Sequence, residues 1–355
     1  MTRKIDKVEA AKAEASNDLL LGIDLGTSRT AVLSNRGLKT LFGSVVGYPK
    51  DIIAIKLIQD NQIIGDEALE NSQFLDLYAP LENGTIKSDP TQKDLDAVRA
   101  LLEHALLQAD AHEGDRKCAI IGVPAKASSQ NVALLLDLAK DVFDISLVVS
   151  EPFLVAYGMK KILNAIVVDI GAGTTDICIL KGILPGPKDQ ITSFMAGDYL
   201  DRELQTMIVN KYPNVQVTRN QVRKIKEKHS FVAGHEATVE VDLREHGKPV
   251  KIDCTKEVRK VCEQIVPTIV EAIEKLVVNC NPEKQAEVLQ NIFLAGGGSQ
   301  IKGLSAMIME ELKAYGKVKV TAVGNPDYAG CEGGLKLAID VPPESWDKIG
   351  PVCGK

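Results

Sequence analysis

The chain has 355 residues, of which 45% are apolar and 25% charged, so its composition is that of a globular protein and its length suits two α/β domains. No segment is apolar enough to span a membrane or to act as a secretory signal, which predicts a cytoplasmic protein without membrane insertion. The net charge of −6 argues against a nucleic-acid partner, and seven scattered cysteines predict reduced thiols.

The first half of the chain predicts one α/β domain over residues 19–164, preceded by a mobile tail over residues 1–18. LLLGIDLGT is typical of a buried strand that meets a glycine turn, and TAVLS of the strand that returns, so a β-hairpin is expected. A less regular subdomain is predicted at about 43–87, with short strands in IIAIKLI and QIIG and a helix in GDEALENSQFLDL. Alternating strands and helices follow, which favours a mostly parallel sheet with covered faces.

The pattern restarts at Ala165, where AIVVDIGAGTTDICIL repeats the strand, glycine turn and strand with the aspartate in the same place. This internal duplication predicts a second α/β domain over 165–340, with its own inserted subdomain at about 211–256. A long helix through EVRKVCEQIVPTIVEAIEKLVVNC is expected to kink at Pro267, and a strand, NIFLAGG, ends in a triple glycine. Residues 341–355 are predicted to form a surface tail.

Two strand-to-glycine turns carry residue types that suit phosphate and a divalent cation. A strand that ends in Asp before Gly-x-Ser/Thr brings backbone N–H groups together beside a carboxylate. One such turn alone is often only a tight hairpin, but two copies and a third glycine cluster together favour a nucleotide site. The candidate residues are Asp24, Gly26, Thr27 and Ser28 in the first turn, Asp169, Gly171, Gly173 and Thr174 in the second, and Gly296, Gly297 and Gly298 in the third cluster.

Neither a P-loop nor a dinucleotide-binding GxGxxG turn is present. The ordered set of turns instead resembles the actin, Hsp70 and sugar kinase superfamily. The resemblance implies two duplicated α/β domains, each with a smaller inserted subdomain, that hold ATP and Mg²⁺ in the cleft between them. It implies that Asp24 and Asp169 hold the Mg²⁺, mostly through water.

Glu151 lies at a strand-to-helix junction between the two turns. A lone Glu-Pro pair ordinarily marks only the start of a helix. In bacterial actins, however, the matching glutamate orients the attacking water, so the resemblance assigns catalysis to Glu151, with Asp169 acting at the metal.

Two further segments are ambiguous. IKEKHSFVAG resembles the part of actin that packs on adenine and ribose, which implies nucleoside contacts for Lys226 and Glu227, although a solvated helix face is equally consistent with it. GDYLDREL resembles the turn that follows the second phosphate loop in these proteins, although the side chains of Asp198 and Asp201 are expected instead to cap a helix.

Within the superfamily, the length leaves no room for the peptide-binding domain of Hsp70, and SEPFLVAYG resembles bacterial actins more than sugar kinases. The similarity over most of residues 19–340 is greatest to the actin-like proteins of magnetosome-forming bacteria. It implies a homopolymeric filament that assembles with ATP, hydrolyses it afterwards, and positions magnetosomes with the help of magnetosome-associated adaptor proteins.

Three alternatives stay open: a cell-shape actin of the MreB type, a plasmid-segregating actin, and a small-molecule kinase or phosphatase. MreB attaches to membranes through apolar residues. Neither the N-terminal tail nor the inserted subdomains of this sequence show an apolar anchor of that kind.

Overall fold

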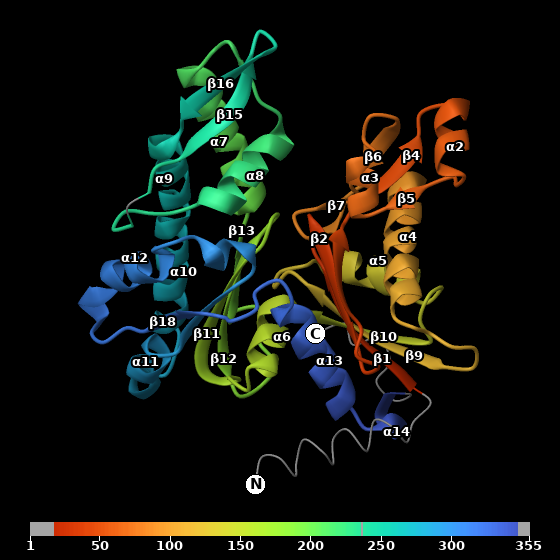
Figure 1. The fold of residues 1–355 in the computed structure, drawn as a ribbon. Coiled ribbons are helices and arrows are strands. Elements are labelled where there is room, and N and C mark those ends of the chain that lie inside the picture. The colour runs from red at the N-terminus through yellow and green to blue at the C-terminus, as the bar shows by residue number, and fades with distance from the viewer. Residues whose placement is uncertain (1–17, 236, 347–355) are drawn as a thin grey trace. The chain divides into compact units, whose positions relative to one another are not determined.

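The computed structural model describes residues 18–235 and 237–346, which divide into two compact units (Figure 1). Unit 1 consists of residues 18–160 and 327–346, and unit 2 of residues 161–326. The sequence had assigned residues up to 340 to the second domain. The structure instead packs helix α13 (Ala329–Asp340) against strand β1 (Asp18–Leu25) and helix α6 (Glu151–Gly158) of unit 1.

Unit 1 is built on a five-stranded sheet with the order β10-β9-β1-β2-β3. Strands β1, β9 and β10 run parallel, and the predicted hairpin of β1 with β2 is confirmed, so the carboxyl ends of the three parallel strands share one edge. The other strands are β2 (Arg29–Ser34), β3 (Lys39–Gly43), β9 (Arg116–Val123) and β10 (Ile145–Ser150).

Side chains on β1 alternate between the two faces of this sheet. Leu19, Leu21 and Ile23 belong to the hydrophobic core that includes residues of α4 (Gln92–Gln108) and α5 (Ser129–Ala139). On the other face, a β-carbon at Gly22 would collide with the backbone of α13. Close packing of α13 therefore depends on the absence of a side chain at this position.

The inserted subdomain differs from its prediction in two elements. The segment IIAIKLI is helix α2 (Ile52–Ile58), although its β-branched residues suggested a strand. Asp51 explains the difference, because its side chain accepts hydrogen bonds from the backbone N–H groups of Ile53 and Ala54 and caps the helix. The predicted helix after it is also shorter, since α3 (Asp66–Glu70) ends before β6 (Leu75–Tyr78).

Helix α2 exposes apolar side chains to solvent, although the sequence showed no obvious apolar anchor in the inserted subdomains. Its only buried residue is Ala54, whereas the side chains of Ile52, Ile53 and Leu57 are 64–68% exposed. The rest of the subdomain consists of short strands, β4 (Val46–Pro49), β5 (Ile63–Ile64), β7 (Leu81–Glu82) and β8 (Thr85–Ile86).

Asp94 connects this subdomain to α4. Its buried carboxylate belongs to the capping box with Thr91 and also accepts hydrogen bonds from the Tyr78 hydroxyl at 2.7 Å and from Lys87 Nζ at 2.5 Å. Although burial favours the protonated form, the bonds from Lys87, Thr91 and Tyr78 hold the pKa of Asp94 well below its ordinary value.

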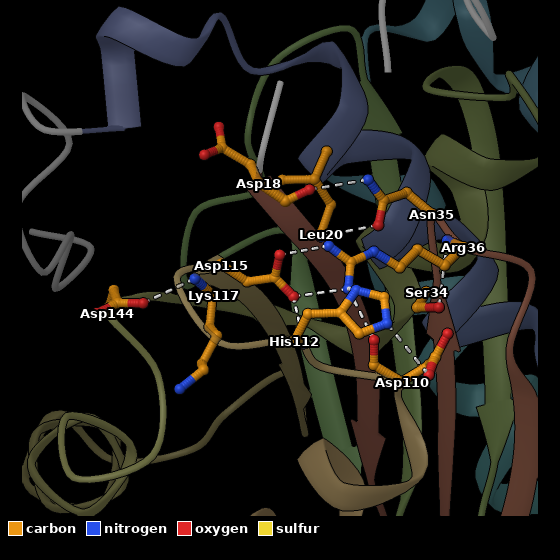
Figure 2. A network of polar contacts seen from close by, with 10 residues as sticks. All are labelled: Asp18, Leu20, Ser34, Asn35, Arg36, Asp110, His112, Asp115, Lys117 and Asp144. Atoms are coloured by element: carbon orange, nitrogen blue, oxygen red, sulfur yellow. Dashed lines mark hydrogen bonds and ion pairs between the residues drawn. The ribbon is translucent and has the colours of Figure 1, made fainter. Parts of the chain in front are cut away.

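A second ion pair fixes the loop between α4 and β9 (Figure 2). Arg36, in the turn after β2, donates two hydrogen bonds of 2.6 Å to the carboxylate of Asp115 and one of 2.7 Å to the carbonyl oxygen of Asp110. The bidentate contact with Arg36 lowers the pKa of Asp115 to about 2. This loop is therefore tied to the β2–β3 hairpin.

Unit 2 repeats the plan of unit 1, as the duplication predicted. Its sheet has the order β13-β12-β11-β17-β18, with β11 paired antiparallel to β12 and parallel to β17. The strands are β11 (Leu163–Ile170), β12 (Thr175–Lys181), β13 (Gln190–Ser193), β17 (Ile292–Ala295) and β18 (Val320–Ala322).

Helices of unit 2 pack against this sheet and against one another. The predicted long helix is two helices that meet at Gln264, because Pro267 cannot donate a backbone hydrogen bond to the preceding turn. The elements are α7 (Gly197–Lys211), α8 (Arg219–His229), α9 (Thr255–Glu263), α10 (Ile265–Val278), α11 (Pro282–Leu289), η1 (Gly297–Gln300), α12 (Leu304–Glu311) and η2 (Lys313–Tyr315), with a small sheet of β14 (Val215–Gln216), β15 (Glu240–Glu245) and β16 (Lys248–Asp253).

The two predicted tails fall largely outside the described residues. Of the two expected tails, residues 1–17 and 347–355 lie outside the described part of the chain. The C-terminal segment before that is not an exposed tail, since it forms the short helix α14 (Pro343–Trp346), in which Trp346 is buried.

Candidate functional site

The first predicted turn lies at the carboxyl end of β1 and is held by backbone and hydroxyl contacts. Gly26 N–H donates to the carbonyl oxygen of Arg29 at 3.1 Å, and the Ser44 hydroxyl donates to the carbonyl oxygen of Gly26 at 2.6 Å. The Thr27 hydroxyl accepts a hydrogen bond of 2.6 Å from the backbone N–H of Gly84. The turn is therefore fixed by residues at both ends of the inserted subdomain.

Asp24, just before this turn, is held in a confined space. A β-carbon at Gly330 would lie 2.5 Å from Asp24 Oδ2, so the first turn of α13 presses against the carboxylate. Burial raises the pKa of Asp24 to about 6. A bound cation would offset that cost and keep the carboxylate charged.

Glu151 lies at the same edge of the unit 1 sheet. It opens α6 directly after β10, with Pro152 in the first turn of the helix. A β-carbon at Gly122 would be 3.1 Å from Glu151 Cγ, and Gly122 is the residue of β9 that pairs with Asp24 of β1. The structure therefore places Glu151 and Asp24 next to the same residue, Gly122.

In unit 2, the second turn and the third glycine cluster meet. Asp169 is buried at the end of β11 and pairs in the parallel register with Ala295 of β17, the residue before Gly296. A β-carbon at Gly296 would collide with Asp169 Oδ1, and one at Gly298 would collide with the Ile170 side chain. Gly171 N–H closes the turn on the carbonyl oxygen of Thr174 at 2.9 Å.

The start of α7 contacts the second turn, in line with the resemblance of GDYLDREL to the segment that follows this turn in related proteins. The backbone N–H groups of Gly197 and Asp198 donate to the carbonyl oxygens of Gly171 and Ala172 at 3.0 and 2.7 Å. The first N–H groups of a helix lack partners within the helix, so the turn supplies acceptors for them. The spacing of GDYLDREL after the second turn was the signal for this contact.

The expected capping role of Asp198 and Asp201 is wrong. The N-cap of α7 is Ala196, and no side chain caps the helix. Both carboxylates instead face α8: Asp198 lies 3.3 Å from Arg223, and the fully buried Asp201 lies 2.7 Å from Lys226 Nζ.

Lys226 and Glu227, adjacent on α8, differ in environment. The Lys226 side chain is 13% exposed and its Nζ also donates to the carbonyl oxygen of Gly197 at 2.8 Å, whereas Glu227 is exposed. The solvated-face interpretation therefore fits Glu227 but not Lys226. The nucleoside contacts stay a prediction for both.

Asp24 in unit 1 and Asp169 in unit 2 each have surroundings in which a carboxylate could bind a magnesium ion through water. Each is a carboxylate at a strand end, pressed by a glycine of another element. The described residues contain no group of three or more His, Cys, Asp or Glu side chains that could enclose a metal. Mg²⁺ gives up water reluctantly and is often held by one or two carboxylates together with phosphates.

Among the described residues, no helix is long and apolar enough to cross a membrane.

Comparison with known sequences identifies relatives over nearly the whole chain. The model of the family described as MreB/Mbl protein matches residues 18–341. The actin-like protein MamK of Magnetospirillum gryphiswaldense is 48% identical over 99% of this chain and 97% of its own length. The cell shape-determining protein Mbl of Bacillus cereus is 27% identical over 88% of this chain and 93% of its own.

Solved structures agree with this assignment. A MamK double helical filament has a TM-score of 0.89 at 48% identity and covers 92% of this chain and 100% of its own. A non-polymerising MamK mutant bound to AMPPNP has a TM-score of 0.72 at 48% identity and covers 91% of this chain and 99% of its own. The predicted actin-like α/β fold is thus confirmed, and the chain belongs to the MreB/Mbl family of actin-like proteins.

Proposed function

We propose that this protein binds ATP with Mg²⁺, assembles into filaments of its own copies, hydrolyses the ATP after assembly, and organises magnetosomes in the cytoplasm. One observation carries the nucleotide part of the proposal. The same strand, turn and strand occurs in both units, and in each the terminal carboxylate, Asp24 or Asp169, is pressed by a glycine from another element.

The site residues take the following roles in this proposal. Backbone N–H groups of the two turns bind the phosphates, and Gly296, Gly297 and Gly298 give the nucleoside a surface without side chains. Asp24 and Asp169 hold Mg²⁺, mostly through water, and the ion would supply neutralisation of the phosphate charge. The phosphate-binding residues are Gly26, Thr27, Ser28, Gly171, Gly173 and Thr174.

Glu151 is the proposed catalytic residue. Its carboxylate accepts a hydrogen bond from the attacking water and orients that water toward the terminal phosphate. The rate gain comes mainly from positioning and electrostatic stabilisation, as is general for phosphoryl transfer. We expect slow hydrolysis by the monomer.

Self-assembly is supported by the exposed side of α2 and by the relatives. Contiguous exposed apolar side chains mark interaction surfaces, and Ile52, Ile53 and Leu57 form such a group. Two of the similar solved structures are MamK filaments. A second copy of this chain is therefore the proposed occupant of the α2 surface, and adaptor proteins are the proposed partners that connect the filament to magnetosomes.

Sedimentation with electron microscopy of the pellet tests this function on the purified full chain. Filaments with ATP and Mg²⁺, and none without nucleotide, are the expected result. ATP binding without assembly would favour a small-molecule kinase or phosphatase. Filaments that sediment only on anionic lipid vesicles would favour a cell-shape actin.

A further inference from the structure

The ammonium group of Lys226 lies between two elements of unit 2 that are distant from it in sequence. Lys226 Nζ is 2.7 Å from Asp201 Oδ1 and donates a hydrogen bond of 2.8 Å to the carbonyl oxygen of Gly197. Both partners belong to the first turns of α7, whereas Lys226 belongs to the last turns of α8. The side chain therefore connects the end of one helix to the start of another.

The start of α7 continues this connection to the second turn. Gly197 N–H donates to the carbonyl oxygen of Gly171, and Asp198 N–H to that of Ala172. A β-carbon at Gly197 would lie 3.1 Å from Ala172 Cα and 3.2 Å from Lys226 Nζ. Gly197 is thus packed between the turn and the ammonium group. Its N–H donates to the turn, and its carbonyl oxygen accepts from Lys226.

The ion pair that anchors Lys226 is buried. Asp201 is fully buried and the Lys226 side chain is 13% exposed, so this contact is little weakened by solvent or salt. Arg223, one helical turn earlier on α8, adds contacts of 3.4 Å to Asp201 and 3.3 Å to Asp198. The orientation of α8 relative to α7 is therefore fixed by charges on both helices.

We propose that Lys226 is a positioning residue, which holds the start of α7 and, through it, the Gly171–Thr174 turn in the conformation that binds phosphate. The ammonium group is already paired with the carboxylate of Asp201 and donates a hydrogen bond to the carbonyl oxygen of Gly197. Lys226 thus governs affinity for the phosphate groups, and the nucleoside contact belongs to other residues. This inference rests on the proposed binding of ATP at this turn.

The test compares ligands with and without phosphates on Lys226→Met. Each of ATP, ADP and adenosine, with Mg²⁺, displaces a fluorescent ATP analogue from the full chain. Loss of a residue that supports a binding group typically weakens binding by roughly tenfold or more, so we expect such a loss for ATP and ADP and less than about a twofold change for adenosine. Lys224→Met, an exposed lysine on the same helix, is the matched control and should leave all three affinities unchanged.

Lys226→Met leaves the carboxylate of Asp201 buried without its ammonium partner, which could destabilise the fold. A second variant therefore controls for destabilisation. The double variant Lys226→Met with Asp201→Asn removes both charges and should show the same loss confined to ATP and ADP. Lys226→Arg should restore part of the ATP affinity.

The outcomes separate this inference from the function on which it rests. Equal losses for ATP, ADP and adenosine would make Lys226 a nucleoside contact and overturn the proposal, and so would unchanged ATP affinity in the double variant. If the unmodified chain binds no ATP, the proposed function itself fails, and the inference fails with it.

Discussion

Gly296 lies against Asp169, at the point where the third glycine cluster meets the second turn. A β-carbon at Gly296 would collide with Asp169 Oδ1 and lie 2.5 Å from the carbonyl oxygen of Ile170. The φ angle of Gly296 is also 70°, a left-handed conformation that favours glycine. The position therefore excludes a side chain for two independent reasons.

Gly296→Ala should consequently displace Asp169 and weaken the binding of ATP with Mg²⁺ by roughly tenfold or more, and the strained backbone should cost about 1–3 kcal/mol of stability. Titration calorimetry and thermal unfolding measure the two effects. Gly324→Ala is the matched control, because a β-carbon there also meets no atom within 4 Å and Gly324 is not among the proposed nucleotide-binding residues. Similar affinities for the two variants would contradict the role given to the contact with Asp169.

The raised pKa of Asp24 predicts how the stability of the ligand-free protein depends on pH. Its pKa is about 6 in the folded state against 3.8 for the ordinary group, because burial disfavours the charge. The protonated form is therefore the stabilising one: its contribution is complete below about pH 4 and is lost as the pH rises through 6. Melting temperatures of the wild type should fall relative to those of Asp24→Asn over this interval, and parallel curves would contradict the raised pKa.

Binding of ATP with Mg²⁺ should have the opposite dependence on pH at the same residue. A cation near Asp24 favours the carboxylate, so binding below about pH 6 must release its proton and is weakened. Affinity of the wild type should therefore increase between pH 5 and 7, while that of Asp24→Asn should be lower and nearly flat. Calorimetry in two buffers of different ionisation enthalpy measures the released proton directly.

The two Asp-Gly turns could be predicted from sequence because each is a local pattern, in which a buried strand, a carboxylate and glycines follow one another directly. Helix α2 could not be predicted from sequence. The β-branched residues of 52–58 favour a strand, and the helix is stabilised by the N-cap residue Asp51. The contacts of Gly330 with Asp24 and of Lys226 with Asp201 join segments far apart in the sequence. No spacing within one segment encodes such contacts, so α13 was assigned to the wrong unit and Asp201 to the wrong role.

Glu151→Gln should separate hydrolysis from binding. The amide keeps the size of the side chain over Gly122 but cannot act as a base toward water. We expect phosphate release in assembled filaments to slow by about 10²-fold, with ATP affinity and assembly retained and filaments that disassemble more slowly. Phosphate release and light scattering on the same sample check both parts. A normal rate of phosphate release in this variant would remove Glu151 from the mechanism.

The exposed side of α2 gives the last prediction, which concerns assembly. Burial of one large aliphatic side chain contributes about 1.5–3 kcal/mol, so a charge at Ile53 should raise the critical concentration roughly tenfold or more if a second copy covers this surface. Ile53→Asp should therefore stay in the supernatant with ATP at concentrations where the wild type sediments, and should bind ATP normally. Leu107→Asp is the control, since Leu107 on α4 is 77% exposed and lies outside the inserted subdomain. Equal assembly of the two variants would show that α2 does not contact another copy, and its apolar surface would then have to be assigned to an adaptor protein.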